Sequence, residues 1–133
     1  MLYLKHPERK LRHFIAMPLI VSMIIPIVIM DGWIEIYHRV AFYMYDIPYI
    51  KRRQYIKLDR HRLQYLNWPQ KLYCTYCGYG NGAVRYWVQI AAATEKYWCG
   101  IMHNNDDLAF ITPKHHQDFA KYADEQNFKA KYL

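Results

Sequence analysis

The strongest constraint on this chain is a run of seventeen residues, Phe14 to Met30, that contains no charged side chain. A helix needs about 17 to 25 apolar residues to cross the hydrocarbon core of a bilayer, so the run lies at the lower edge of that range. It is long for the apolar region of a secretory signal peptide, and no small-x-small cleavage site follows it. We therefore predict a membrane-embedded helix over residues 14–30, preceded by a basic flank.

Two prolines, Pro18 and Pro26, lie inside this run. Each lacks a backbone donor and disturbs the carbonyl one turn earlier, which predicts a kink near residues 22–26. A kinked or re-entrant hairpin would return the chain to the side it left, whereas a single span would place everything after Met30 on the other side. Basic residues on both flanks favour the first topology. The three cysteines further along favour it too, because an odd number suits reduced metal ligands better than disulfides. We therefore expect the soluble part of the protein to lie on the cytoplasmic side of the membrane.

Residues 31–50 have helical periodicity with mixed polarity. The apolar set is Trp33, Ile34, Tyr37, Val40, Ala41 and Met44, and the polar set on the other side is Asp31, Glu35, His38 and Arg39. This pattern predicts an interfacial helix that lies along the membrane surface. Glu35 and His38 also have the spacing of carboxylate-bridged metal sites, but such bundles use two copies of the motif. We therefore favour a polar interfacial face.

Residues 51–62 form a basic segment that contains Tyr55 and is flanked by the aromatic residues Tyr49, Tyr65 and Trp68. Its basic residues are Lys51, Arg52, Arg53, Lys57, Arg60 and Arg62. The whole chain has 18 Lys and Arg against 11 Asp and Glu, a formal net charge of +7, which favours an anionic partner. Such a segment can bind single-stranded nucleic acid, but its position shortly after a membrane helix favours anionic lipid headgroups. The DRHR cluster at 59–62 predicts a salt-bridged turn rather than a catalytic acid–base group, because no nucleophile with a partner base is apparent beside it.

All three cysteines lie between residues 74 and 99. Cys74 and Cys77 form a C-x-x-C pair, and Cys99 and His103 form a C-x-x-x-H pair after a 21-residue spacer. Two clustered pairs of thiolate and imidazole ligands suit one tetrahedral ion, so we predict a zinc site, with iron as the alternative. An odd number of cysteines fits this site better than a disulfide framework. Three buried cysteines that act as small hydrophobic side chains are the competing interpretation.

The glycines and helical patterns around these cysteines predict the local structure. Gly78, Gly80 and Gly82 predict a tight metal knuckle with positive φ, and Asn81 can cap the helix that follows. Residues 83–98 carry an apolar stripe, which predicts an amphipathic helix that ends at the third cysteine.

A second helix is predicted in the tail. Thr112 followed by Pro113 favours a helix start, and the helix should run to about Gln126. His115 and His116 in its first turn are alternative metal ligands, although solvated histidines there need no such role.

Three motifs occur in order along the chain: DRHR with YLNW over residues 59–68, CTYCGYGNG over 74–82 and TEKYWCGIMH over 94–103. From about Asp31 to His103 the chain resembles a family of small, uncharacterised bacterial membrane-associated proteins with similar elements. The resemblance implies a location in the bacterial inner membrane, but no particular activity. It does imply that this region is one folded unit.

These features predict a mainly α protein with an N-terminal membrane-embedded helix and a small metal-stapled helical domain. Residues 1–50 should hold the flank, the membrane helix and the interfacial helix, and residues 51–133 should form a basic, Cys/His metal-binding domain with a C-terminal helix. In so small and loop-rich a domain the metal would be structural.

We therefore expect a non-enzymatic, membrane-anchored, zinc-binding subunit or assembly factor of a larger membrane complex or homo-oligomer. The alternatives are an iron-binding electron carrier and a membrane-surface enzyme that acts on an anionic lipid or small molecule.

Overall fold

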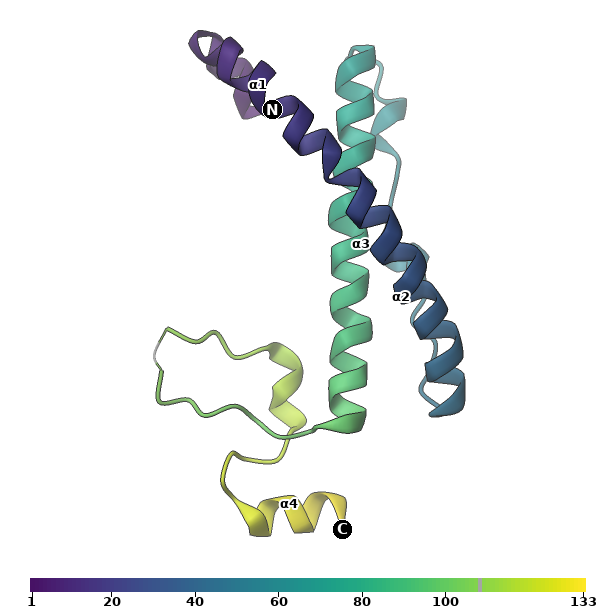
Figure 1. Ribbon diagram of the computed structural model, residues 1–133, viewed down its shortest axis with the longest axis vertical. Coiled ribbons are helices and arrows are strands. Elements are labelled where there is room, and N and C mark those ends of the chain that lie inside the picture. The colour runs from purple at the N-terminus through teal and green to yellow at the C-terminus, as the bar shows by residue number, and fades with distance from the viewer. Residues whose placement is uncertain (108) are drawn as a thin grey trace. The chain divides into compact units, whose positions relative to one another are not determined.

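In a computed structural model, which describes residues 1–107 and 109–133, the protein is mainly helical, as the sequence predicts (Figure 1). Within those two ranges there is no β-strand, and an isolated bridge pairs Ile101 with Ala120. The chain divides into two compact units, Met1–Trp87 and Val88–Leu133. Residues 51–87 therefore belong with the amino-terminal helices, whereas the sequence pattern grouped them with the carboxyl-terminal part.

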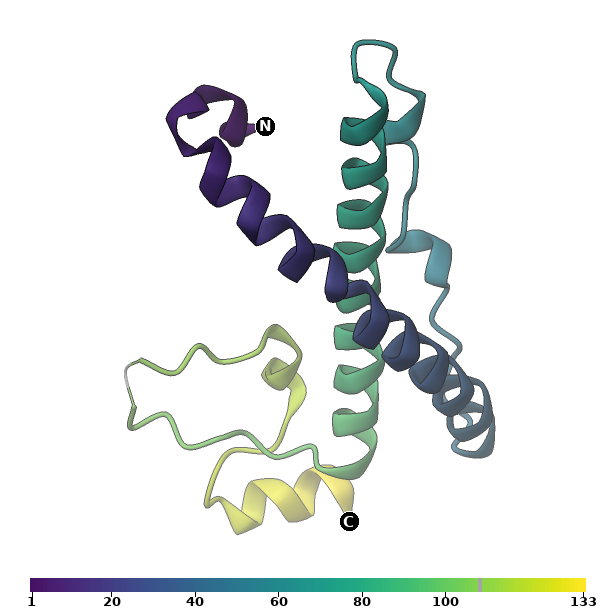
Figure 2. The ribbon, with the colours of Figure 1, turned by 45° about the horizontal axis from the view of Figure 1, so that its top comes forward.

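The amino-terminal unit begins with two short 3-10 helices, Leu2–Lys5 and Pro7–Arg9, followed by α1 (Lys10–Ser22) and α2 (Ile24–Met44). The chain passes from α1 to α2 through a break at Met23 (Figure 2). Pro26 has no amide hydrogen and so cannot bond to the carbonyl of Ser22, which accounts for the break. The break lies within the range 22–26 where the sequence predicted a kink. Because α2 passes Met30 without interruption, the second half of the expected embedded segment and most of the expected interfacial segment form one helix.

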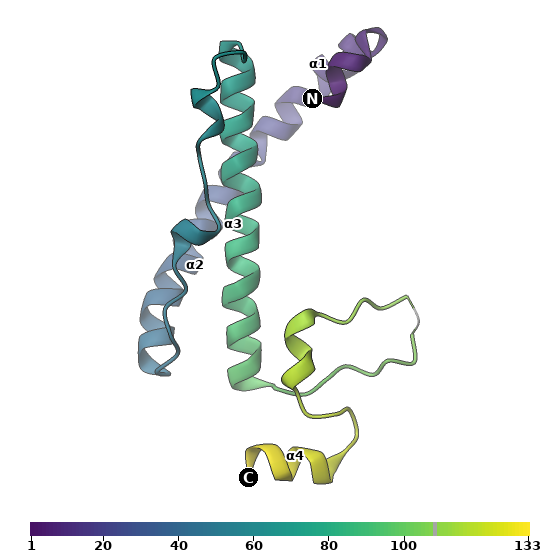
Figure 3. The ribbon, with the colours of Figure 1, turned by 180° about the vertical axis from the view of Figure 1, so that it is seen from behind.

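The long helix α3 (Trp68–Trp98) starts in this unit. Tyr73 Oη bonds to Met17 Sδ at 3.3 Å, and further along both helices Tyr86 Oη bonds to Glu35 Oε2 at 3.0 Å. The residue numbers rise together, so α1 and α2 run in the same direction as the first part of α3. A parallel pair needs a connection that returns along its length, and residues 45–67 provide it (Figure 3). This connection contains two 3-10 turns, Arg52–Gln54 and Arg60–Arg62.

Glycines of α3 allow the returning segment to lie directly against the helix. A Cβ on Gly82 would lie 2.9 Å from both the Cα of Ile56 and the carbonyl oxygen of Tyr55. A Cβ on Gly78, one turn earlier, would lie 3.4 Å from the carbonyl oxygen of Lys57. A helical glycine costs about 1 kcal/mol relative to alanine, and this backbone contact is what offsets that cost.

The metal knuckle that the sequence predicted over residues 78–82 is therefore wrong, because these residues lie inside α3. Asn81 does not cap a helix; its side-chain amide donates to the carbonyl of Cys77 at 2.9 Å within α3. The helix predicted over 83–98 is confirmed as the second half of α3.

We expect Gly82→Ala to lower the free energy of unfolding by about 1–3 kcal/mol, because the new methyl group meets backbone atoms that cannot move independently. Gly32→Ala is the matched control, since a Cβ there has nothing within 4 Å. The control should be neutral or should stabilise the protein by up to about 1 kcal/mol through helix propensity. Chemical denaturation in mild detergent measures both variants, and equal stability of the two would contradict the close approach at Gly82.

The second unit begins with the last turns of α3 and a helix stop. Gly100 has a φ of +50°, the left-handed conformation that commonly follows a helix, and its amide donates to the carbonyl of Glu95 at 3.1 Å. The chain then pairs with a distant segment: the amide of Ala120 donates to the carbonyl of Gly100 at 2.7 Å, and the amide of Met102 donates to the carbonyl of Ala120 at 2.8 Å. These bonds hold the residues after α3 beside residue 120.

The helix predicted from Thr112 to about Gln126 is wrong. The chain forms a 3-10 helix over Lys114–Asp118 and a separate helix, α4, over Glu125–Tyr132. The continuous helix is lost because Phe119 and Ala120 are buried and Ala120 pairs with Ile101 in extended conformation. The side chain of Asp124 then caps α4 by accepting from the amide of Asn127 at 2.8 Å.

Candidate functional site

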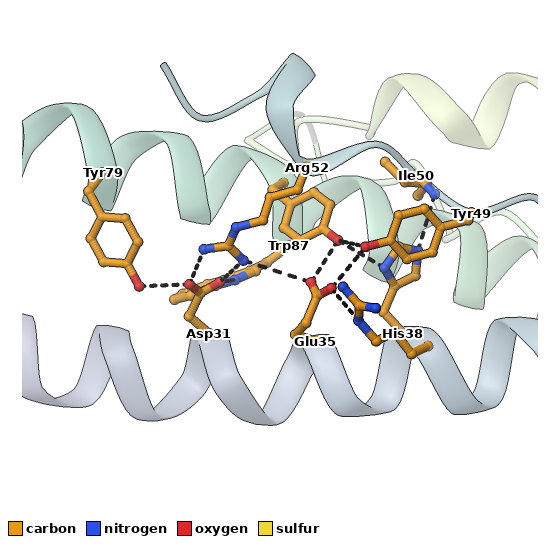
Figure 4. Close-up of polar contacts among 10 residues, drawn as sticks. Asp31, Glu35, His38, Tyr49, Ile50, Arg52, Tyr79 and Trp87 are labelled. Atoms are coloured by element: carbon orange, nitrogen blue, oxygen red, sulfur yellow. Dashed lines mark hydrogen bonds and ion pairs between the residues drawn. The ribbon is translucent and has the colours of Figure 1, made fainter. Parts of the chain in front are cut away.

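In the first unit, α2 presents three ionisable side chains, Asp31, Glu35 and His38, to α3 and the returning segment (Figure 4). Asp31 accepts four hydrogen bonds. Arg52 donates to both carboxylate oxygens, Tyr79 Oη donates to Oδ2 at 2.7 Å, and Trp87 Nε1 donates to Oδ1 at 3.1 Å. Asp31 is only 6% exposed, so water does not solvate its charge. The bidentate guanidinium of Arg52 balances that charge instead.

Glu35 and His38 are joined through the hydroxyl of Tyr86, which lies 3.0 Å from Glu35 Oε2 and 2.9 Å from His38 Nδ1. The amide of Ile50 donates to His38 Nε2 at 3.2 Å. That nitrogen is therefore the acceptor of a neutral ring, and the proton lies on Nδ1. His38 donates to Tyr86, Tyr86 donates to Glu35 Oε2, and Tyr49 donates to Glu35 Oε1 at 2.8 Å. The result is a directed hydrogen-bond chain from His38 to Glu35.

Burial fixes the protonation of this network. His38 and Tyr86 are fully buried, and Phe42 packs edge-on against the ring of His38 with the centroids 4.4 Å apart. Burial, together with the hydrogen bond to Tyr49, raises the pKa of Tyr86 well above its ordinary value, so its hydroxyl stays protonated. The hydrogen bonds to Asp31 likewise raise the pKa of Arg52. A buried network whose groups are paired in this way holds α2 rigidly against α3 and the returning segment.

The polar face expected to lie at the membrane interface points inward instead. Asp31 and His38 are buried, whereas Trp33 is 73% exposed and Val40 is 56% exposed. Glu35 and His38, the residues of the alternative metal site, are both hydrogen-bonded to Tyr86.

An open pocket of about 460 Å³ lies beside this network, lined in part by His38, Arg39 and Tyr49. Arg39 Nε donates to Glu35 Oε1 at 2.8 Å, so the cation at this pocket is already ion-paired. Tyr49 stacks on His38 with the ring centroids 4.2 Å apart. The pocket therefore presents aromatic surface and a neutralised cation.

A second cluster of ionisable side chains lies in the unit Val88–Leu133. Glu95, near the end of α3, pairs with His115 Nε2 at 2.7 Å and with His116 Nε2 at 3.1 Å. One potential ligand atom from each of Glu95, His103 and His116 lies within 4.8 Å of the other two. The hydrogen bond from His115 and the nearby ring of His116 lower the pKa of Glu95. These side chains could hold a metal ion.

The structure divides the metal ligands predicted from the sequence. Cys74 and Cys77 lie one turn apart on α3 in the first unit, whereas Cys99 and His103 belong to the second. All three cysteines are free thiols. Helix α3 continues from the first pair to Trp98, and a helix rises about 1.5 Å per residue. One zinc or iron ion on all four residues remains a prediction.

The basic residues predicted to face lipid divide in a similar way. Five of them are exposed: Lys51, Arg53, Lys57, Arg60 and Arg62. Arg52 departs from the prediction, because its side chain is only 34% exposed and is paired with Asp31. The DRHR segment forms a 3-10 turn in which Asp59 pairs with Lys57 at 3.3 Å, in keeping with the salt-bridged turn.

Sequence reasoning overlooked Tyr79, Tyr86 and Trp87 as partners of α2. A knuckle over residues 78–82 would place Tyr79 outside a helix, so the prediction did not put Tyr79 and Tyr86 on one helical face. Their spacing of seven residues was the available signal, because it repeats after two helical turns and matches the seven-residue spacing from Asp31 to His38.

No family model, curated protein or solved structure matches this chain. The resemblance to small bacterial membrane-associated proteins therefore stays a prediction.

Proposed function

We propose that this is a non-enzymatic, membrane-anchored accessory protein, in which α1 and α2 contact the bilayer and a larger membrane complex. The outer surface of these helices carries the proposal. The helical stretch Pro7–Met44 includes an 18-residue window with a mean hydropathy of 2.3, and none of that window is buried inside the protein. A core helix of a water-soluble protein with this composition would be covered by the rest of the chain.

The polarity of α2 supports an apolar environment. Two of its ionisable residues, Asp31 and His38, are buried against partners, and its exposed positions are mostly apolar. The exposed charge on α2 is Arg39, which is ion-paired with Glu35. In membrane proteins, ionisable side chains face the protein interior and pair there, because a charge in contact with hydrocarbon is costly. A helix built for water would have the opposite polarity.

The apolar stripe on α2 continues beyond Met30, the end of the predicted embedded segment. Its exposed members there are Trp33, Ile36, Val40, Tyr43 and Met44, which are 56–87% exposed. A continuous exposed apolar surface of this kind marks contact with lipid or with another protein. Directly behind it lies the paired network of Asp31, Glu35 and His38, which suits a rigid scaffold for a partner.

Alkaline carbonate extraction followed by native sizing tests both parts of this proposal. Wild-type protein should stay in the membrane pellet, and Leu19→Glu combined with Ile25→Glu should release it, because a charged residue at mid-membrane adds about 2.5–3.5 kcal/mol to insertion. The side chains of Leu19 and Ile25 are 71% and 63% exposed. Tyr65→Glu, at an exposed position of the returning segment, is the control and should leave the protein in the pellet.

In mild detergent, wild-type protein should migrate above the size of a monomer in its micelle. Trp33→Glu combined with Val40→Glu should shift it to the monomer position while the carbonate pellet is unchanged. Arg85→Glu, an exposed change on α3, should not shift it. Wild-type protein in the carbonate supernatant would remove the anchor, and a wild-type monomer would remove the accessory role alone.

A further inference from the structure

The fold of the second unit brings three metal-ligand side chains to the end of α3. Glu95 lies on the last turns of the helix, and Gly100 turns the chain away from it. The bridge between Ile101 and Ala120 then fixes the two segments that carry the histidines. His103 comes two residues after the bridge on one segment, and His116 comes four residues before it on the other.

We propose that Glu95, His103 and His116 bind one divalent transition-metal ion of the zinc type. One potential ligand atom from each of them lies within 4.8 Å of the other two. Atoms that share one ion at about 2.0–2.2 Å lie roughly 3.3–3.6 Å apart, so binding requires the longest of these separations to shorten by at most about 1.5 Å. His103 can supply this shortening, because its side chain is exposed and its backbone lies outside the helices. The proposal does not depend on the membrane anchor, since all three residues lie in the unit Val88–Leu133.

The donor set selects the class of ion. Two imidazole nitrogens and one carboxylate oxygen suit zinc and its neighbours, whereas calcium and magnesium prefer sites made of oxygen. Three protein ligands leave a fourth position for water. His115 bonds to the other carboxylate oxygen of Glu95 at 2.7 Å, and it therefore orients the carboxylate rather than completing the set.

A second observation at His116 points to a missing ligand. His116 is fully buried, and its Nδ1 has no hydrogen-bond partner among the described residues. Phe119 stacks on the ring with the centroids 4.6 Å apart and holds its plane. A buried histidine is normally bonded at both nitrogens, so the chain alone leaves this imidazole incomplete. Its ring lies 5.3 Å from the ring of His103, centroid to centroid.

The test is binding of Zn²⁺ by the full chain in mild detergent after removal of metal with a chelator. Equilibrium dialysis should give about one equivalent for the wild type. His103→Ala and Glu95→Gln should each weaken binding by roughly 100-fold or more, because even outer-shell changes cost 10- to 100-fold. His103 is exposed, so its variant should keep the wild-type circular dichroism spectrum and remain interpretable. His61→Ala, an exposed histidine of the other unit, should bind as the wild type does.

The combined variant Cys74→Ser, Cys77→Ser and Cys99→Ser separates this site from the cysteine site predicted by the sequence. It should keep its equivalent of Zn²⁺, and Co²⁺-loaded wild-type protein should lack the near-ultraviolet charge-transfer band that thiolate ligands produce. Loss of the ion from the cysteine variant, with retention in His103→Ala and Glu95→Gln, would overturn the proposal. Equal binding by every variant would show adventitious metal only, and it would overturn the proposal as well.

Discussion

Asp31→Ala should lower the free energy of unfolding by about 3–5 kcal/mol, the usual cost of removing one partner of a buried ion pair. The change removes the bidentate partner of Arg52 and leaves it only the longer ion pair with Glu35 Oε2 at 3.8 Å. The donors of Tyr79 and Trp87 lose their acceptor at the same time. Chemical denaturation in mild detergent, followed by circular dichroism, measures the loss. Tryptophan fluorescence should also change, since Trp87 Nε1 bonds directly to Asp31.

The control for this prediction is Asp59→Ala, which removes an ion pair of the same chemistry from the surface. Asp59 pairs with Lys57 at 3.3 Å, with side-chain exposures of 52% and 83%, so the change should cost at most about 1 kcal/mol. The double variant Asp31→Ala with Arg52→Met should recover part of the loss, because no unpaired charge is left inside. Similar small losses for Asp31→Ala and Asp59→Ala would show that the buried pair is not a main support of the fold.

The apolar run and its break were predictable because their causes are local. A stretch without charge is visible in the sequence, and the effect of Pro26 acts within one helical turn. The first half of α3 was not predictable in this way. Gly78, Gly80 and Gly82 have low helix propensity, and only contact with a segment more than twenty residues away makes helix the better conformation for them.

For the candidate sites, too, the sequence shows local spacing but not contacts between distant segments. The spacing of Asp31, Glu35 and His38 marks one side of a helix, but whether that side meets water or protein depends on the course of residues 45–67. The grouping of Glu95 with His103 and His116 depends on a bridge between residues 101 and 120 that has no sequence signature. Sequence spacing instead favoured the cysteines, because pairs close in sequence are the ones it can detect.

Tyr86→Phe should lower the free energy of unfolding by about 2–4 kcal/mol, although it removes a single oxygen atom. That hydroxyl lies 2.9 Å from His38 Nδ1 and 3.0 Å from Glu35 Oε2. Its loss leaves the buried donor of His38 unpaired, which costs about 1–3 kcal/mol, and it removes a hydrogen bond from the half-buried Glu35. Tyr43→Phe is the control, because Tyr43 is 87% exposed and its variant should stay within about 0.5 kcal/mol of the wild type.

The difference in free energy of unfolding between the wild type and Tyr86→Phe should decrease at alkaline pH. Folding raises the pKa of Tyr86 above its ordinary value of 10.0, first through burial and then through its hydrogen bonds. The unfolded chain therefore loses the proton at lower pH than the folded protein does, and the stability from the hydroxyl is complete below pH 10.0 and declines above it. Denaturation of both proteins at a series of pH values from neutral to strongly alkaline should give a stability difference that is constant at first and then shrinks. A difference that grows with alkaline pH would mean that the hydroxyl is ionised more readily in the folded protein, and that His38 and Glu35 are not joined through a neutral tyrosine.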